Sequence, residues 1–247
     1  MGKASKRSRG KTAVSVGLKI AIFISMVIGL RHTFAGGSFM SRNSLLFFTI
    51  QSNLWIGCWC LLFALLQILG ALRGKNCIRP WMHAVKFMFT TSITLTFAVM
   101  TAMLTPVMIA QGGGAALLQP SNIFPHYVVP ILSVADFFLF DTDWRPRRRS
   151  ALLAVIMPLC YITTSFALGA AGVQYTPEGD TFPYFFMDYQ AMGWFRGFQP
   201  DGKYGAMTLG TAWWLLILTI FVVLMGYAYI ALQKRSRHSR LAQIPFA

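Results

Sequence analysis

The chain has 247 residues, of which 55% are hydrophobic and 12% are charged, and its formal net charge at pH 7 is +15. So few charged residues over this length exclude an ordinary soluble domain and are typical of a protein with several membrane spans. The positive charge does not indicate nucleic-acid binding, because the basic residues stand in short groups beside apolar runs. Groups of this kind orient membrane helices and contact anionic lipid.

Six apolar runs follow one another along the chain, and the fourth is short and interrupted by Pro130. They cover residues 13–31, 45–70, 83–109, 124–140, 150–172 and 207–232. A helix of about 20 apolar residues crosses a bilayer. We therefore predict an all-α polytopic membrane protein, with residues 1–247 forming a single integral membrane domain of six transmembrane helices.

Lys and Arg alternate between dense and sparse segments along the chain. The dense segments are the tails 1–12 and 233–247 and the connections 71–82 and 141–149. The sparse segments are 32–44, 110–123 and 173–206. Because basic segments stay on the cytoplasmic side, this alternation predicts that both termini are cytoplasmic. We expect the protein in the cell (inner) membrane.

The longest connection, residues 173–206, is predicted to lie outside and is rich in aromatic residues. Aromatic side chains gather at the membrane interface, so the segment is either an interfacial anchor or a cap over the helices. We expect the helices to enclose a pocket below it that opens to the outer leaflet, with the side chains of Thr49 and His126 facing the pocket. The middle of the apolar runs is expected to lack charged residues, with Asp136 near the cytoplasmic boundary, and this argues against an ion or proton pathway.

A compact polar patch opens the second run. Thr49, Ser52 and Asn53 share one helix face because positions i, i+3 and i+4 are neighbours, and Gln51 lies in the same turns. Polar groups at this depth are costly without partners. The patch either bonds to neighbouring helices or forms part of an active site.

His126 begins the fourth run and is expected at the depth of Thr49, as are Arg31 and His32 at the end of the first run. A hydroxyl beside an imidazole is the minimum for nucleophilic catalysis, since the imidazole accepts the proton as the hydroxyl attacks a carbonyl. The amide of Asn53 or Gln51 would donate to the developing oxyanion. Asp188, in the outer loop, would reach His126 if that loop folds inward. Ser52 supports the same patch.

Three short motifs resemble those of bacterial six-helix relatives of the androgen-induced-gene family, which are integral-membrane hydrolases of fatty acid esters of hydroxy fatty acids. The motifs are FTIQSN at 48–53, PHYVVP at 125–130 and PYFFMD at 183–188. The resemblance extends over residues 12–232. In that family activity depends on a membrane-embedded Thr and a His. The resemblance implies that Thr49 is the nucleophile and His126 the general base.

The sequence thus predicts a threonine-dependent hydrolase of lipid esters, with acyl transfer as a close variant. The expected partners are a fatty acid ester substrate and membrane lipids, and neither a cofactor, a metal nor a nucleic acid is predicted. Two other classes stay open. One is a non-catalytic scaffold or a transporter. The other is a haem-binding protein that uses His32 and His126 as axial ligands, since they lie at one depth on different helices.

Overall fold

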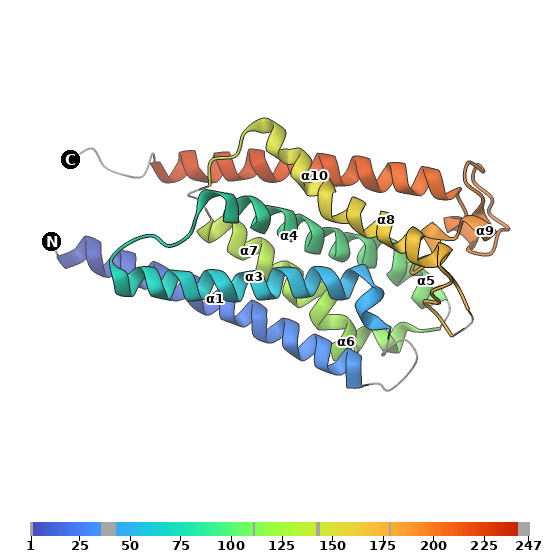
Figure 1. Ribbon diagram of the computed structural model, residues 1–247, viewed down its shortest axis with the longest axis horizontal. Coiled ribbons are helices and arrows are strands. Elements are labelled where there is room, and N and C mark those ends of the chain that lie inside the picture. The colour runs from blue at the N-terminus through green and yellow to red at the C-terminus, as the bar shows by residue number, and fades with distance from the viewer. Residues whose placement is uncertain (1, 36–42, 111, 142–143, 178, 242–247) are drawn as a thin grey trace.

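The computed structural model is a bundle of long helices, and it describes residues 2–35, 43–110, 112–141, 144–177 and 179–241. Residues 1 and 242–247 of the predicted tails lie outside the described residues, as do residues 36–42. The described ends, Gly2 and Leu241, lie at the same end of the bundle (Figure 1). An even number of crossings requires this arrangement. We call this end the terminal end and the opposite end the cap end.

Among the described residues, six helical segments are long and apolar enough to cross a membrane. They are Gly10–Ala35, Phe48–Arg73, Pro80–Ala110, Pro120–Phe140, Arg148–Ala170 and Thr211–Arg235. The predicted all-α fold with six membrane-spanning helices is confirmed. The predicted bounds of the six runs differ from those of the spans by four residues or fewer at each end. Which face of the membrane each end meets stays a prediction.

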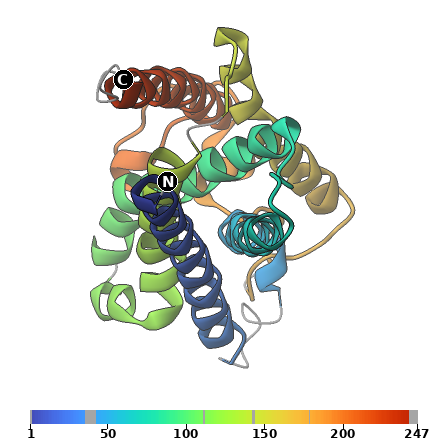
Figure 2. The ribbon, with the colours of Figure 1, turned by 90° about the vertical axis from the view of Figure 1, so that its left-hand side faces the viewer.

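The first two long helices are α1, Gly2–Ala35, and α3, Phe48–Arg73, and they run side by side (Figures 1 and 2). Close packing near the cap end depends on Gly29 of α1. A Cβ at this position would lie 2.9 Å from the Pro125 ring. The absence of a side chain therefore lets α1 approach the segment that carries His126.

The third span consists of α4, Pro80–Val99, a π-helical turn over Met100–Leu104, and α5, Thr105–Ala110. The fourth consists of α6, Pro120–Ile123, a π-helical turn over Phe124–Val128, and α7, Val129–Phe140. Pro130 does not end the fourth helix, because the π-helical turn before it accommodates the missing N–H. The fourth span is therefore continuous, and His126 lies within the π-helical turn.

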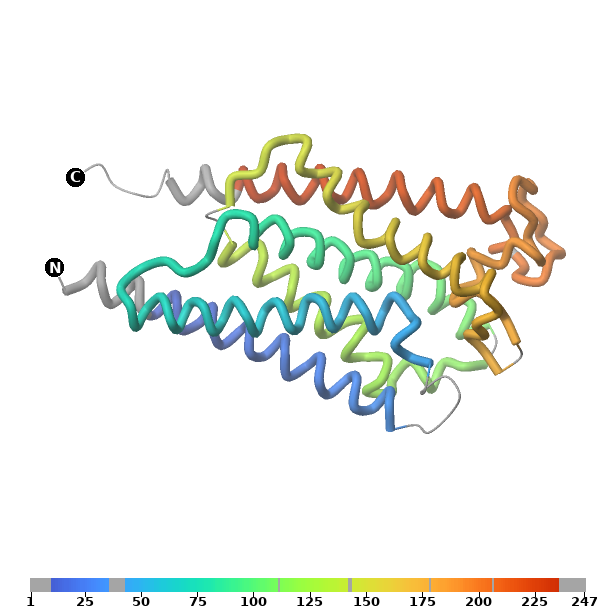
Figure 3. Tube along the Cα trace, in the orientation of Figure 1, coloured from blue at the N-terminus to red at the C-terminus, as the bar shows by residue number. Residues whose placement is uncertain are grey.

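The fifth span joins a 3₁₀ segment, Arg148–Val155, to α8, Ile156–Ala170. The sixth is α10, Thr211–Leu241, which runs along the edge of the bundle opposite the cap-end half of α1 (Figures 1 to 3). Each of the six spans is mostly apolar, so their common interior forms the core. Two buried clusters fill it, one around Ile22 and Ile93 and one around Phe87 and Phe137.

The segment 171–210 between α8 and α10 folds over one end of the bundle, and we call it the cap (Figure 1). It contains a short helix α9, Tyr189–Met192, and all its residues except 178 are described. Buried cap side chains, including Phe185 and Met187, pack against α10 and the third span. At Gly169 the carbonyl oxygen of Thr181 would lie 2.3 Å from an added Cβ. The cap is thus seated directly on the helices.

Candidate functional site

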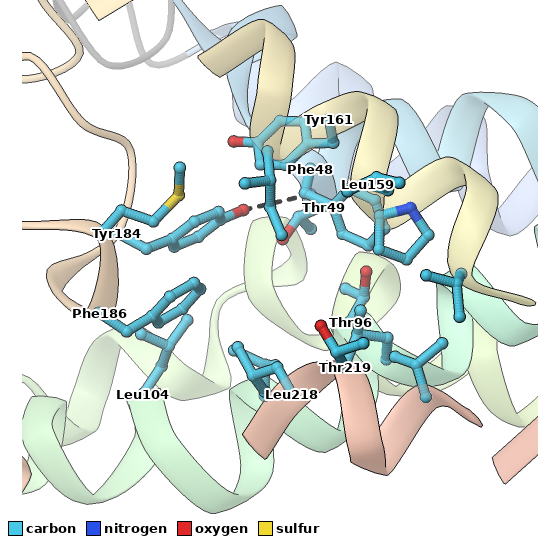
Figure 4. A pocket seen from close by; sticks show the side chains of 17 residues that line it. Phe48, Thr49, Thr96, Leu104, Leu159, Tyr161, Tyr184, Phe186, Leu218 and Thr219 are labelled. Atoms are coloured by element: carbon cyan, nitrogen blue, oxygen red, sulfur yellow. Dashed lines mark hydrogen bonds between the residues drawn. The ribbon is translucent and has the colours of Figure 1, made fainter. Parts of the chain in front are cut away.

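A cavity of about 230 Å³ lies at the cap end between α3, α4, α8, α10 and the cap. Five hydroxyl-bearing residues line it and all other lining residues are apolar. The hydroxyl-bearing residues are Thr49, Thr96, Tyr161, Tyr184 and Thr219 (Figure 4). Leu159 of α8 lines the cavity and is also 57% exposed on the outside of the bundle. The cavity therefore lies near the surface that would face lipid.

Three of the five hydroxyls form hydrogen bonds with Ser52 or with backbone carbonyls. Thr96 Oγ1 lies 2.8 Å from Ser52 Oγ, Tyr161 donates to the carbonyl of Leu46 at 3.1 Å, and Thr219 donates to the carbonyl of Leu215 at 2.7 Å. Hydroxyls with such partners contribute to helix packing. The remaining two, of Thr49 and Tyr184, lie beside one another and form the polar end of the cavity.

Thr49 is half-buried in the first turn of α3, and its side chain lines the cavity. The helix begins after Phe47, which offers no capping side chain, so the first backbone N–H groups lack helical partners. One of them, the N–H of Thr49, donates to the Tyr184 hydroxyl at 3.4 Å (Figure 4). The start of α3 and the cap therefore meet at Thr49.

Asn53 links the helix of Thr49 to the segment of His126. Its side-chain amide donates to the carbonyl of Thr49 at 2.7 Å and to the carbonyl of Pro125 at 3.0 Å. The Pro125 carbonyl is left unpaired by its own helix, because the N–H of Val129 bonds to Phe124 and Pro130 has no N–H. Both amide hydrogens of Asn53 are thus used by backbone carbonyls, so its predicted donation to an oxyanion does not fit this geometry.

His126 is buried next to Pro125, and its Nδ1 atom has no hydrogen-bond partner. The prediction that His126 lies at the level of Thr49 agrees with the Asn53 bridge. The residues that line the cavity do not include His126. The expectation that both side chains face one pocket therefore holds for Thr49 alone.

Three further predicted residues lie away from the cavity. The amide of Gln51 donates to the carbonyl of Leu45 at 2.9 Å, which commits one of its two amide hydrogens. Arg31 and His32 are exposed at the end of α1. Because His32 is exposed while His126 is buried, the structure does not present the two imidazoles to a common haem site.

Asp188 does not pair with His126 and instead holds the cap together. Its carboxylate accepts hydrogen bonds from the backbone N–H of Ala191 at 2.9 Å, from Tyr204 at 2.8 Å and from Lys203 at 3.1 Å. Asp188 is 1% exposed and directly follows Met187, a residue of the cavity wall. Its role is therefore to position the cap residues that close the cavity.

A second polar region lies toward the terminal end, where four charged side chains are buried together. Lys19 of α1 bonds to Asp136 of α7 at 2.7 Å, and Lys86 of α4 bonds to both Asp136 and Asp141. All four are 0–2% exposed. Asp136 stands four residues before the end of α7, which agrees with its predicted place near one boundary of the membrane region. The cluster lies toward the terminal end, so the expected lack of charged residues at the midplane stays a prediction. None of the four lines the cavity.

Neither this ionic cluster nor a role for Tyr184 was predicted from the sequence. Lys19 and Lys86 each stand within a predicted membrane run, and a charged residue in such a run is itself a signal that a partner exists. Tyr184 lies within the motif at 183–188, but no feature of the sequence separates it from the many other aromatic residues of the cap segment. Only the folding of the cap onto α3 distinguishes it.

No family model, curated protein or solved structure matches this chain. The resemblance of the three motifs to the androgen-induced-gene family therefore stays a prediction. Two of the motifs, at 48–53 and 125–130, are bridged by the amide of Asn53. The third, at 183–188, reaches the first through Tyr184. The three motifs are thus neighbours in the fold although they are far apart in the sequence.

Proposed function

We propose that the protein is a cell-membrane hydrolase that cleaves fatty acid esters through Thr49, as the family resemblance implies. The observation that carries the proposal is the position of Thr49, whose hydroxyl stands in the wall of an otherwise mostly apolar cavity. An apolar cavity with one polar end suits an alkyl chain whose ester group lies at that end. The position of Leu159 near the lipid-facing surface fits a substrate that arrives from the bilayer.

In the proposed reaction, Thr49 Oγ1 bonds to the ester carbonyl carbon as its proton passes to the imidazole of His126. The tetrahedral intermediate collapses, the alkoxide leaves and takes that proton, and an acyl-Thr49 ester remains. Water repeats the sequence and releases the fatty acid. His126 has an unpartnered nitrogen available to accept the proton, and its imidazole must move toward Thr49 when substrate binds. Hydrogen bonds between catalytic groups often tighten only in the complex.

The test uses the full-length protein in lipid vesicles with long-chain chromogenic esters. Thr49→Ala removes the nucleophile and is expected to reduce hydrolysis to background. His126→Ala is expected to lower kcat by about 10²–10⁴-fold. The double variant should be no worse than the poorer single one, because the two residues act as a unit. Thr163→Ala is the matched control, since Thr163 is exposed on α8 and lies outside the cavity.

A second candidate function is the binding of an acyl chain without chemistry. It is favoured by the absence of His126 from the cavity wall. The same experiment distinguishes the two functions, because they predict different results. Folded Thr49→Ala protein that hydrolyses esters at the parent rate would contradict the hydrolase. A parent protein that binds a fluorescent fatty acid but hydrolyses no ester would support the binding function.

A further inference from the structure

We infer that Tyr184 is a further catalytic residue, whose phenol O–H donates a hydrogen bond to the ester oxygen that becomes negative during attack by Thr49. This inference rests on the proposed function and names the group that the predicted mechanism lacked. An acyl-transfer site needs a donor aimed at the developing oxyanion. The amide of Asn53, the expected donor, is occupied by two backbone carbonyls.

The hydroxyls around the cavity leave Tyr184 as the donor beside Thr49. Thr96, Tyr161 and Thr219 are engaged with Ser52 or with backbone carbonyls, as described above. The Tyr184 oxygen accepts from the backbone N–H of Thr49, and accepting leaves the O–H proton for another acceptor. A carbonyl oxygen bound next to Thr49 is such an acceptor. Figure 4 shows the Tyr184 phenol extending from the cap toward Thr49.

Aromatic packing fixes the position of the phenol. The Tyr184 ring stacks on Phe186 with centroids 5.2 Å apart and planes 7° apart, and it meets the Phe47 ring edge-on at 6.0 Å. A donor that is held in place before reaction costs no reorganisation when the charge develops. Asp188, four residues further on, holds the same cap segment through Lys203 and Tyr204. The cap thus contributes a reacting group and does not merely cover the site.

The environment keeps the phenol protonated. Burial raises the pKa of Tyr184 above its usual value of 10, and hydrogen bonding with Thr49 opposes this shift only in part. A neutral phenol is a donor, whereas a phenolate is not. In the reaction Tyr184 keeps its proton, since the proton that moves is the one that travels from Thr49 to His126 and on to the leaving alkoxide.

Tyr184→Phe tests the inference because it removes the hydroxyl and retains the ring that stacks on Phe186. We expect kcat for a long-chain chromogenic ester to fall by about 10²–10³-fold, as for other oxyanion donors, with KM changed little. Tyr175→Phe is the matched control. Tyr175 also belongs to the cap and also meets the Phe47 ring edge-on, at 6.1 Å, but it does not line the cavity. It should retain the parent kcat.

A pH profile supplies a second readout that a structural role would not move. The parent kcat should fall only above pH 10, where the phenol O–H is lost, and Tyr184→Phe should lack that alkaline limb. If Tyr184→Phe shows no melting transition, the parent profile decides, and a kcat without any alkaline fall up to the pH at which the parent protein unfolds overturns the inference. A folded Tyr184→Phe variant with the parent kcat also overturns the inference. The proposed function is then retained, provided that hydrolysis still depends on Thr49. Absence of Thr49-dependent hydrolysis in the parent overturns the proposed function and this inference together.

Discussion

The two polar regions of this bundle differ in how completely their groups are paired. Toward the terminal end, two lysines and two aspartates balance in charge, and each carboxylate lies against at least one ammonium group. At the cap end the groups are neutral hydroxyls around a cavity, and that of Tyr184 accepts from the Thr49 N–H and keeps its own proton for a ligand. Charge alone would have marked the terminal end as the functional site. Incomplete pairing beside a cavity marks the cap end.

The physical reason for this difference is the cost of polar groups in an apolar bundle. A buried charge without a partner is very unfavourable, so the ionic cluster is stable only because every member is paired. The free-energy cost of a hydroxyl beside a cavity is far lower, so such a group can remain without a protein partner until a substrate binds. We therefore expect changes in the ionic cluster to alter stability and changes at the cap end to alter turnover.

The largest expected effect on stability is that of Asp136→Asn. It leaves Lys19 and Lys86 buried without the carboxylate that joins them, although Asp141 still contacts Lys86. Loss of one member of a buried ion pair typically costs about 3–5 kcal/mol. Thermal melting in detergent measures this loss, and Asp201→Asn in the exposed part of the cap is the control, expected within about 0.5 kcal/mol of the parent.

The kcat of the same variant provides a second test of this prediction. Asp136→Asn protein that remains folded at low temperature should hydrolyse esters at the parent kcat, because Asp136 does not line the cavity. Unchanged melting with lost turnover would reverse the assignment of the two regions. It would indicate that the ionic cluster carries function.

Asn53→Ala is expected to have an intermediate effect, since Asn53 belongs to the helix of Thr49 but serves backbone carbonyls. The change leaves the carbonyl of Pro125 unpaired and should lower the free energy of unfolding by about 1–3 kcal/mol. The kcat of the folded Asn53→Ala variant should fall less than the kcat of His126→Ala. A fall of about 10³-fold without any change in melting would restore Asn53 as the oxyanion donor in place of Tyr184.

The smallest expected effect is the pH dependence of cap stability. Lys203 has a raised pKa in the folded protein because of its hydrogen bond with Tyr204 and its pairing with Asp188, and burial raises the pKa of Tyr184. Raised folded pKa values favour protonated groups, so their contribution is complete below the unfolded values of about 10 and is lost as the pH rises further. The melting temperature should be level from pH 7 to 9 and fall above 10. A decrease that begins below pH 8 would show that other groups control the cap.

The sequence was sufficient to predict the six helices, because their apolar runs are long and are separated by polar connections. It was also sufficient to predict that Thr49 and His126 lie at one level, since the depth of a residue in a helix follows from its position in the apolar run. It could not predict the pairing of Lys19 with Asp136, which are 117 residues apart and meet only when α1 packs on α7. Nor could it single out Tyr184, because the position of that phenol depends on how the cap folds back onto α3.

Detection of an acyl group on Thr49 would identify the proposed nucleophile. Full-length protein in vesicles would be mixed with a long-chain ester, quenched in acid within the first turnover and digested for mass spectrometry. We predict an adduct with the mass of the acyl chain on the peptide that contains Thr49. The adduct should be absent in Thr49→Ala and should accumulate more slowly in Tyr184→Phe. Ester hydrolysis with the acyl group on another residue, or undiminished in Thr49→Ala, would contradict this prediction.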